Sequence, residues 1–296
     1  DTSLFTMRFV GTPFTFAYEQ VGNNCGLLGK NAAVEVDGAA YWMSDNGFFR
    51  YTGQLQSMQC LVEDYVYDDL NTSSNQLVYC GINNLFGEIT WFYCTSGSNV
   101  VDRSVTYSYL DSTTDRPIWF TNASSIFPRT TWEDSAVFGL PHATQYEADT
   151  DTCGTVGNTD GISIYYEHET GVNYIKGGTS YAVPASITSG DYDITQDQRE
   201  GISFRGDGEF IMRVSRIIPD FITQTGNAIV QLDLRDYPND AATSSPLGPF
   251  TLTPTTTKVD TRARARQIAL TISNTAVDSN WKLGTFRLDV HSGGRR

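Results

Sequence analysis

The chain has 296 residues, of which 12 % are aromatic and 18 % are charged, and its formal net charge is −14. Such a composition excludes a disordered, fibrous or coiled-coil protein, because strand-forming aromatic residues are abundant and charges are few. No apolar run approaches the roughly 20 residues that a membrane-spanning helix needs, so we expect no membrane insertion. A strong negative charge also opposes binding to nucleic acid.

The first clear elements are two consecutive hairpins. Short runs of alternating apolar residues flank Asp37-Gly38, and the chain turns again at Asp45-Asn46-Gly47 before "FFRYTG". Asp-Gly between such runs is among the strongest short-range hairpin signals. The pattern predicts a meander of at least three strands and makes Asp45 and Gly47 a turn device.

Helical periodicity is confined to residues 57–71, where Cys60, Leu61, Tyr65 and Leu70 would lie near one face. We expect one or two turns of helix there. Elsewhere, short strand patterns recur every 10 to 15 residues or so, as in an all-β sandwich, barrel or propeller.

Aromatic residues recur within these strand groups, as in a β-propeller whose blades stack aromatic side chains between neighbouring sheets. We therefore predict an all-β fold with propeller-like antiparallel blades in residues 1–225 and a C-terminal β unit with a basic end in residues 226–296. The C-terminal unit is either a sandwich or a final blade.

Five cysteines occur without a CxxC pair, which favours buried reduced thiols over a zinc site or a disulfide framework.

The chain begins with "DTSLFTMRF", without an initiator Met or a leader. Either a leader has been removed or the chain is the C-terminal part of a longer polypeptide.

Two segments carry acidic groups that could form a site. In "YYEHETG", a strand would place Glu167 and Glu169 about 7 Å apart on one face and His168 on the other, which would suit a glycosidase only beside a cleft. The alternative is a solvated strand end before Gly171. Residues 147–161 read as a plain acidic loop or an incidental cation site. We expect no catalytic site, cofactor or metal.

The sharpest local feature is the basic C-terminal segment. Residues 257–296 hold eight basic and three acidic residues, about +5, which leaves about −19 on the first 256. "TRARARQIALTIS" places Arg262, Arg264 and Arg266 on one face of a strand and Ala263 and Ala265 on the other. These arginines would contact carboxylates of a neighbouring copy or phosphates, or they would protect a solvated edge strand.

Two further strand segments extend the pattern. "FRLDVHS" alternates Leu288 and Val290 inward with Arg287, Asp289 and His291 outward, and the chain ends on Arg295 and Arg296. In "MRVSR", Arg213 and Arg216 would fall on opposite faces of a strand. Intersubunit or phosphate contacts are therefore assigned to the following residues: Arg262, Arg264, Arg266, Arg287, Arg295 and Arg296.

Several strings resemble the C-terminal part of tail-tube nozzle or hub proteins of short-tailed bacteriophages. They are "LFTMRFVGTPFTF", "AAYWMSDNGFFRYTG", "EITWFYCTSGSNVVDRSVTYSYLD", "YYEHETGVN" and the closing "RARARQIALTISNTAVDSNWKLGTFRLDVHSGGRR". The resemblance covers nearly the whole chain, and its motifs are aromatic-rich strands rather than a catalytic signature.

This resemblance implies a virion structural protein that assembles in the host cytoplasm into a ring of six copies around the DNA exit channel of the tail. Its partners would be copies of itself, an adaptor and tail fibres. DNA would pass through an acidic channel without tight binding. Two alternatives stay open: a glycan-binding receptor-recognition propeller, with Trp91 or Trp119 stacking on sugars, and a glycosidase using Glu167.

Overall fold

The computed structural model describes residues 2–123, 126–147, 161–197, 201–203, 210–237 and 246–294. The chain forms two compact units, Asp1–Thr170 (unit 1) and Gly171–Arg296 (unit 2). The expected boundary at 225/226 lies inside unit 2, because β19, before that boundary, pairs with β23 and β26, which follow it. Strand pairing over this distance leaves no local signal in the sequence. Among the described residues, no helix is long and apolar enough to cross a membrane.

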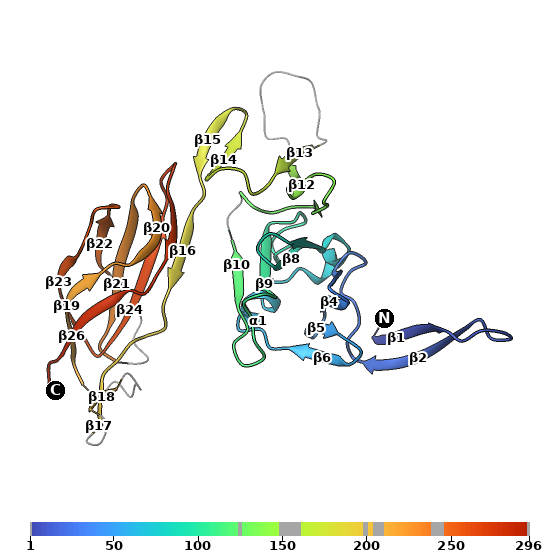
Figure 1. Cartoon of the computed structure of the whole chain (residues 1–296), viewed down its shortest axis with the longest axis horizontal. Helices are drawn as coiled ribbons and strands as arrows, with labels where there is room; N and C mark the ends of the chain where they lie inside the picture. Colours follow the sequence, from blue (N-terminus) through green and yellow to red (C-terminus); the bar gives the residue numbers. More distant parts are fainter. Residues whose placement is uncertain are drawn as a thin grey trace. The chain divides into compact units, whose positions relative to one another are not determined.

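Unit 1 begins with a hairpin and continues with three antiparallel sheets (Figure 1). The hairpin consists of β1 (Ser3–Phe9) and β2 (Phe16–Asn23). The first sheet holds β3 (Ala33–Val36), β4 (Ala39–Ser44), β5 (Gly47–Tyr51) and β6 (Leu55–Met58). The second holds β7 (Tyr79–Asn83), β8 (Glu88–Tyr93), β9 (Arg103–Ser108) and β10 (Trp119–Asn122). The third holds β11 (Thr131–Glu133), β12 (His142–Glu147) and β13 (Ile162–Glu167).

The expected hairpin turns are confirmed. Asp37 and Gly38 connect β3 to β4 with φ angles of 52° and 79°, the left-handed conformation that a two-residue hairpin loop requires. Ser44 pairs with Gly47 across the next loop, and Gly47 has φ 118°. Asp45 and Gly47 therefore belong to a turn.

The single α-helix described, α1 (Glu63–Tyr67), and the 3-10 helix η1 (Thr72–Leu77) lie within or next to the expected helical stretch. The expected helix face is wrong, because Leu61 and Tyr65 are exposed and Val66 is the buried residue. The helix is too short for the period of the sequence to select its buried side.

Aromatic residues pack between the sheets of unit 1, as the sequence predicts for propeller-like blades. Phe48 of the first sheet lies 4.9 Å from Trp91 and 4.8 Å from Trp119 of the second, between ring centroids. Phe92 stacks on Trp132, at the third sheet, at 6.0 Å. The all-β class is therefore confirmed, but the described sheets do not form a closed propeller.

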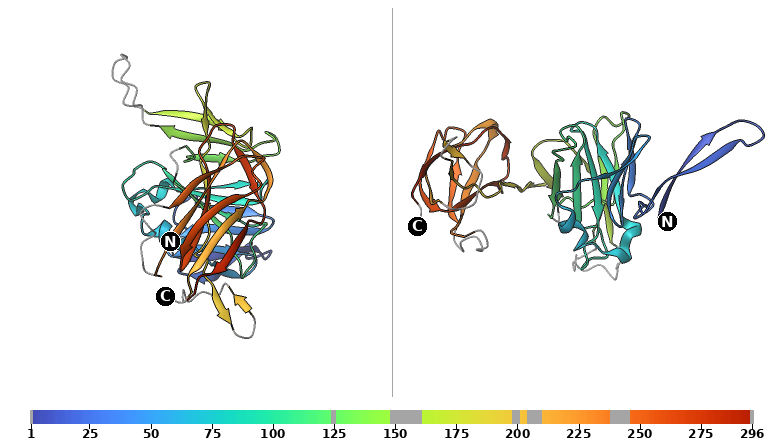
Figure 2. Two further views of the ribbon diagram at one scale, coloured as in Figure 1. Left: turned by 90° about the vertical axis from the view of Figure 1, so that its left-hand side faces the viewer. Right: turned by 90° about the horizontal axis from the view of Figure 1, so that it is seen from below.

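Unit 2 is a β-sandwich in which two sheets share one core. In the first sheet the order is β16 (Ala185–Thr188), β24 (Gln267–Asn274), β21 (Ala228–Arg235) and β22 (Leu247–Leu252). In the second it is β23 (Val259–Ala265), β19 (Met212–Ile218) and β26 (Arg287–Ser292). Figure 2 shows these strands from two further directions.

Three two-stranded ribbons complete unit 2: β14 (Asn173–Lys176) with β15 (Thr179–Ala182), β17 (Thr195–Asp197) with β18 (Gly201–Ser203), and β20 (Phe221–Thr225) with β25 (Asn280–Leu283). The open choice between sandwich and final blade is thus decided for the sandwich.

Four cysteines, Cys25, Cys60, Cys80 and Cys94, are free and buried, as expected. Burial raises the pKa of the Cys60 thiol to about 12 and that of Cys94 to about 11, so both stay protonated. Cys153 lies outside the described residues.

Candidate functional site

The alternation expected in "TRARA" is present in β23. Ala263 and Ala265 are each 2 % exposed and pack in the core of unit 2, whereas Arg262 and Arg264 are exposed on the other side of the strand. An apolar residue at every second position buries one face of the strand and presents the arginines to solvent.

The neighbouring strand β19 adds Arg213 to the same side. Arg213 pairs with Arg264 of β23 and with His291 of β26, and cross-strand partners share a face of the sheet. The expectation that Arg213 and Arg216 point to opposite faces is wrong. A bulge between Val214 and Arg216 shifts the alternation by one residue, so Val214 and Ile217 are both buried and both arginines face outward.

The third strand, β26, presents Arg287, Asp289 and His291 on this side and packs Leu288 and Val290 against the core, as predicted. We call the outward side of this sheet the arginine face. It consists of Arg213, Arg216, Arg262, Arg264 and Arg287, with His291 and the two carboxylates Asp260 and Asp289.

Both carboxylates of the arginine face already have basic partners. Arg216 lies 3.2 Å from Asp260 and 3.3 Å from Asp289, and Lys258 lies 3.0 Å from Asp260. Side-chain hydrogen bonds from Lys258 and Arg216 hold the pKa of Asp260 below its ordinary value. The charges of Asp260 and Asp289 are therefore already balanced by Arg216 and Lys258.

The side chains of the other four arginines of this face, Arg213, Arg262, Arg264 and Arg287, donate no hydrogen bond to, and form no ion pair with, any residue that the structure describes. Arg213 even stands directly opposite Arg264, although like charges at such positions destabilise a sheet. A surface that keeps like charges together without neutralising them is suited to an anionic partner.

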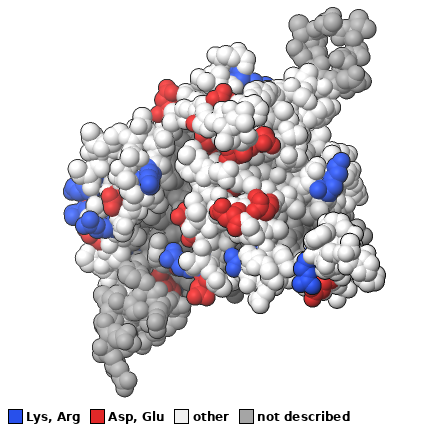
Figure 3. Space-filling model, turned by 45° about the vertical axis from the view of Figure 1, so that its right-hand side comes forward, with Lys and Arg blue, Asp and Glu red and all other residues white. Residues whose placement is uncertain are grey.

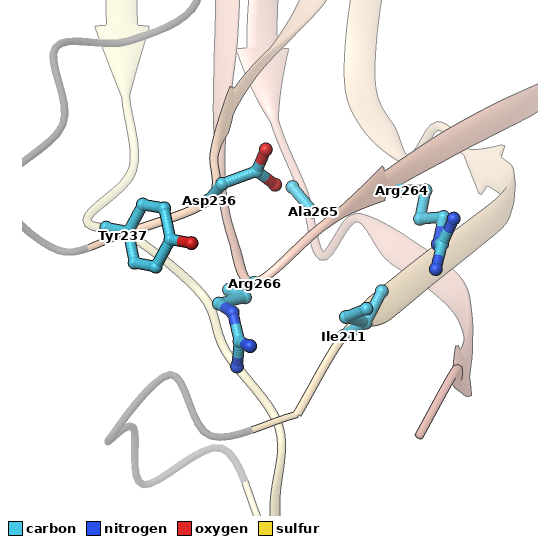
Figure 4. Close-up of a pocket in the computed structure, with 6 residues that line it drawn as sticks. All are labelled: Ile211, Asp236, Tyr237, Arg264, Ala265 and Arg266. Carbon is cyan, nitrogen blue, oxygen red and sulfur yellow. The ribbon is translucent and has the colours of Figure 1, made fainter. Parts of the chain in front are cut away.

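Arg266 departs from the expected row because β23 ends at Ala265. The backbone N–H of Arg266 donates to Arg235 O at 3.1 Å, and its side chain is half-buried. Beside it lies a groove of about 370 Å³ that Figure 4 shows. The groove is lined by Ile211, Asp236, Tyr237, Arg264, Ala265 and Arg266. Arg295 and Arg296 lie outside the described residues.

The two units differ sharply in charge. Unit 1 holds 21 acidic and 6 basic residues, a net charge of −15, whereas unit 2 holds 13 acidic and 14 basic residues, a net charge of +1. Figure 3 shows several Asp and Glu side chains gathered on one face of the molecule. The acidic charge that the sequence assigned to the first 256 residues is therefore concentrated in unit 1.

The Glu167-His168-Glu169 segment is not a simple solvated strand end. Glu167 ends β13 and is exposed, but His168 turns inward and accepts a hydrogen bond from Arg129 Nε at Nε2, at 2.8 Å. Glu169 has left the strand with φ 62° and accepts a hydrogen bond from Asn83 Nδ2 at 2.8 Å. The expected same-face carboxylate pair is therefore absent from the described residues, since Glu169 follows a turn.

Arg129 is the residue that sequence reasoning missed. It is 2 % exposed, and Nη1 donates to the carbonyls of Ile126 and Pro128 and to Gln145 Oε1 at 2.8 to 3.0 Å. The guanidinium also lies 4.2 Å from the centre of the Tyr166 ring. Burial, and then the Arg129 charge, lower the pKa of His168 to about 3. His168 is therefore neutral near pH 7, and this cluster ties the third sheet together.

Glu88 and Glu169 are two glutamates of unit 1 whose pKa values are raised in the folded protein. Burial, followed by the charges of Glu169 and Asp111, raises the pKa of Glu88, and burial raises the pKa of Glu169. An acid whose pKa is raised by folding favours the folded state below its ordinary pKa of 4.5, and this contribution is lost as the pH rises through the raised pKa.

We therefore expect Glu88→Gln to stabilise unit 1 near pH 8 and to have little effect near pH 4, because glutamine cannot ionise. Thermal unfolding should show a rise in Tm of roughly 1–3 °C at the higher pH only. The matched control is Glu133→Gln, an exposed glutamate on β11, which should leave Tm unchanged at both pH values. An equal rise at both values for Glu88→Gln would contradict the electrostatic explanation.

Among the described residues, no group of three or more His, Cys, Asp or Glu side chains is arranged to hold a metal ion. Residues 148–160, most of the acidic loop considered as a cation site, lie outside the described part. No protein-family model and no curated protein sequence matches this chain. The arginine face is thus the strongest candidate site, and its role is argued from geometry and charge.

Proposed function

We propose that this chain is a structural subunit of a ring in the tail of a short-tailed bacteriophage, in which copies contact one another head to tail. The observation that carries the proposal is that one chain has two parts of opposite charge. Unit 2 carries the arginine face, with four arginines that have no acidic partner, and unit 1 carries a net charge of −15. Two different surfaces of opposite charge on one chain favour a heterologous contact, which closes into a ring when the rotation permits.

Guanidinium groups suit this contact because each one can donate two parallel hydrogen bonds to a carboxylate. The acidic residues of unit 1 outnumber its basic residues by 15, so a neighbouring copy offers enough carboxylates for Arg213, Arg262 and Arg264. Their positions on paired strands also hold the charges in a fixed pattern, which gives the contact a defined register.

The acidic unit also fits a conduit for DNA. Phosphates bind proteins chiefly by releasing condensed counterions onto basic side chains, and an acidic wall offers no such exchange. DNA would therefore pass such a ring without being held. The sequence resemblance to nozzle proteins supports the same role and adds six as the number of copies, with an adaptor and fibres as neighbours in the virion.

A glycan-binding role has less support. The tryptophans on which sugar stacking would depend lie inside unit 1: Trp91 is fully buried and Trp119 packs against the same core. Trp42 is 4 % exposed, and Trp132 and Trp281 are half-buried. Since a sugar-binding platform needs an open ring face, these residues favour a structural role.

The charge-reversed double variant Arg262→Glu/Arg264→Glu tests the proposal. We expect the wild-type chain to form a closed ring, seen by light scattering and electron microscopy, and the variant to assemble on the order of 100-fold more weakly, since opposing like charges cost several kcal/mol. Raising the salt from about 0.05 M to about 0.5 M should weaken wild-type assembly.

The matched control is Arg116→Glu, which reverses an exposed arginine in a turn of unit 1 and should assemble like the wild type. A wild-type chain that remains monomeric at every concentration and salt would overturn the proposal. So would a double variant that assembles as tightly as the wild type.

A further inference from the structure

The hairpin formed by β1 and β2 carries a row of large apolar side chains along one face. Phe9 pairs with Phe16 and Met7 with Tyr18, and residues opposite each other or two apart along a strand share a face. Phe5 continues the row. We call these five residues the aromatic stripe: Phe5, Met7, Phe9, Phe16 and Tyr18. The other face presents Thr6, Arg8, Ala17 and Glu19.

The aromatic stripe is open to solvent. Its five side chains belong to residues that are 49 to 70 % exposed, and Phe14 in the connecting loop is 76 % exposed. Figures 1 and 2 show the hairpin extending beyond the sheets of unit 1. A two-stranded hairpin is marginally stable in water by itself, and a contiguous apolar surface of this kind marks an interaction site.

Unit 1 offers a second uncovered aromatic surface on its third sheet. Ala143, Gln145 and Tyr166 are buried, so the alternate residues of β12 and β13 face outward. On that side the ring of His142 lies 4.8 Å from Phe138 and 5.3 Å from Tyr165. We call this surface the outer aromatic patch: Phe138, His142, Tyr146 and Tyr165. Phe138 is 58 % and Tyr165 61 % exposed.

Within unit 1, each pair of neighbouring sheets meets through aromatic side chains, such as Phe48 against Trp91 and Phe92 against Trp132. The outer aromatic patch lies where a further layer of the same kind would pack. In the described residues no strand covers it. A ribbon with one aromatic face has the shape and chemistry of that missing layer.

We propose that the aromatic stripe of one copy packs on the outer aromatic patch of the next copy. The inference rests on the proposed function, since it takes a ring of identical chains as its starting point. Stripe and patch are different surfaces of one chain, so their contact is heterologous, as a ring requires.

The surface area of the aromatic stripe is large enough for such a contact. Five large side chains, each half to two-thirds exposed, remove on the order of 600 Å² from water when they are covered. That is most of the roughly 800 Å² that each partner buries in a stable protein interface. The polar face of the hairpin, with Arg8 and Glu19, remains in water.

Cross-linking tests which surfaces meet. One chain carries Met7→Cys in the stripe and the other carries Ser163→Cys, an exposed position on the outward face of β13 opposite Tyr146. Both also carry Cys153→Ser. The two chains are mixed at low protein concentration, where copies are dissociated, then concentrated and mildly oxidised, and we expect a disulfide-linked dimer of the two different chains. Arg8→Cys, on the polar face of the hairpin, should not form it.

Two outcomes would overturn the inference: no mixed dimer, or an equally efficient dimer from Met7→Cys chains alone, which would place two hairpins against each other. A second measurement uses Phe9→Ser/Tyr18→Ser, with Arg8→Ser/Glu19→Ser as the control. The first should weaken ring assembly at least tenfold with unit 1 still folded by circular dichroism, and the control should not.

The two proposals fail separately. Rings that form equally well with the Phe9→Ser/Tyr18→Ser chain would overturn the docking of the hairpin and leave the ring intact. A wild-type chain that never forms a ring would overturn the proposed function and, with it, this contact.

Discussion

Replacing Trp91 with alanine is expected to lower the free energy of unfolding of unit 1 by about 3–5 kcal/mol. The side chain is fully buried and its ring centroid lies 4.9 Å from that of Phe48 and 6.1 Å from that of Trp119. Its Nε1–H donates to Ala32 O at 3.0 Å, so the substitution leaves a cavity and an unpaired carbonyl as well.

Hydrogen exchange read by mass spectrometry measures this loss peptide by peptide. Peptides of unit 1 should exchange faster and those of unit 2 should not change, because the two cores are separate. The matched control is Phe86→Ala, since Phe86 is 51 % exposed in the turn between β7 and β8. A loss below about 1 kcal/mol for Trp91→Ala would show that these sheets do not depend on the aromatic layer.

Arg129→Met is expected to destabilise unit 1 by about 3–4 kcal/mol near pH 7. The variant keeps an unbranched apolar side chain but removes the donors to Ile126 O, Pro128 O and Gln145 Oε1. The buried acceptors Pro128 O and Gln145 Oε1 and the part-buried Ile126 O are then left with one donor fewer. Chemical denaturation at pH 7 measures the loss, and Arg50→Met, a half-buried arginine of β5, serves as the control with a loss below about 1 kcal/mol.

The same variant should change the pH dependence of stability. In the wild type, the pKa of His168 is lowered from 6.5 to about 3, so the unfolded chain binds the proton more readily. The contribution of His168 to the free energy of unfolding is therefore fully present above pH 6.5 and is lost as the pH falls toward 3. Without the Arg129 charge, the loss of stability on acidification should be smaller. The free energies of unfolding of the variant and the wild type should therefore differ less at pH 5 than at pH 7. A constant difference would contradict the coupling between the two residues.

Local patterns of the sequence were sufficient for much of the fold. Asp37-Gly38 predicted a hairpin because its turn needs two residues in the left-handed region, which these residue types tolerate. The sequence also predicted that Arg262 and Arg264 lie on the same outward face, because alternate residues of a strand face opposite sides whatever the strand pairs with.

Other features of the candidate site left no such signal. The bulge that turns Arg216 to the side of Arg213 depends on how β19 pairs with β23 and β26, strands that come later in the chain. The contact between Arg129 and His168 joins residues 39 positions apart that share no motif. The exposure of the β1–β2 hairpin also depends on what the rest of unit 1 leaves uncovered.

The sequence by itself therefore determined the all-β class, the hairpin turns, the buried reduced state of the four described cysteines and the outward arginines of β23. These follow from turn chemistry, periodicity and composition, which act over a few residues. Only the tertiary structure decided the boundary after Thr170, the sandwich of unit 2 and the neighbours of each charge, because pairing between distant strands depends on the burial of the whole chain.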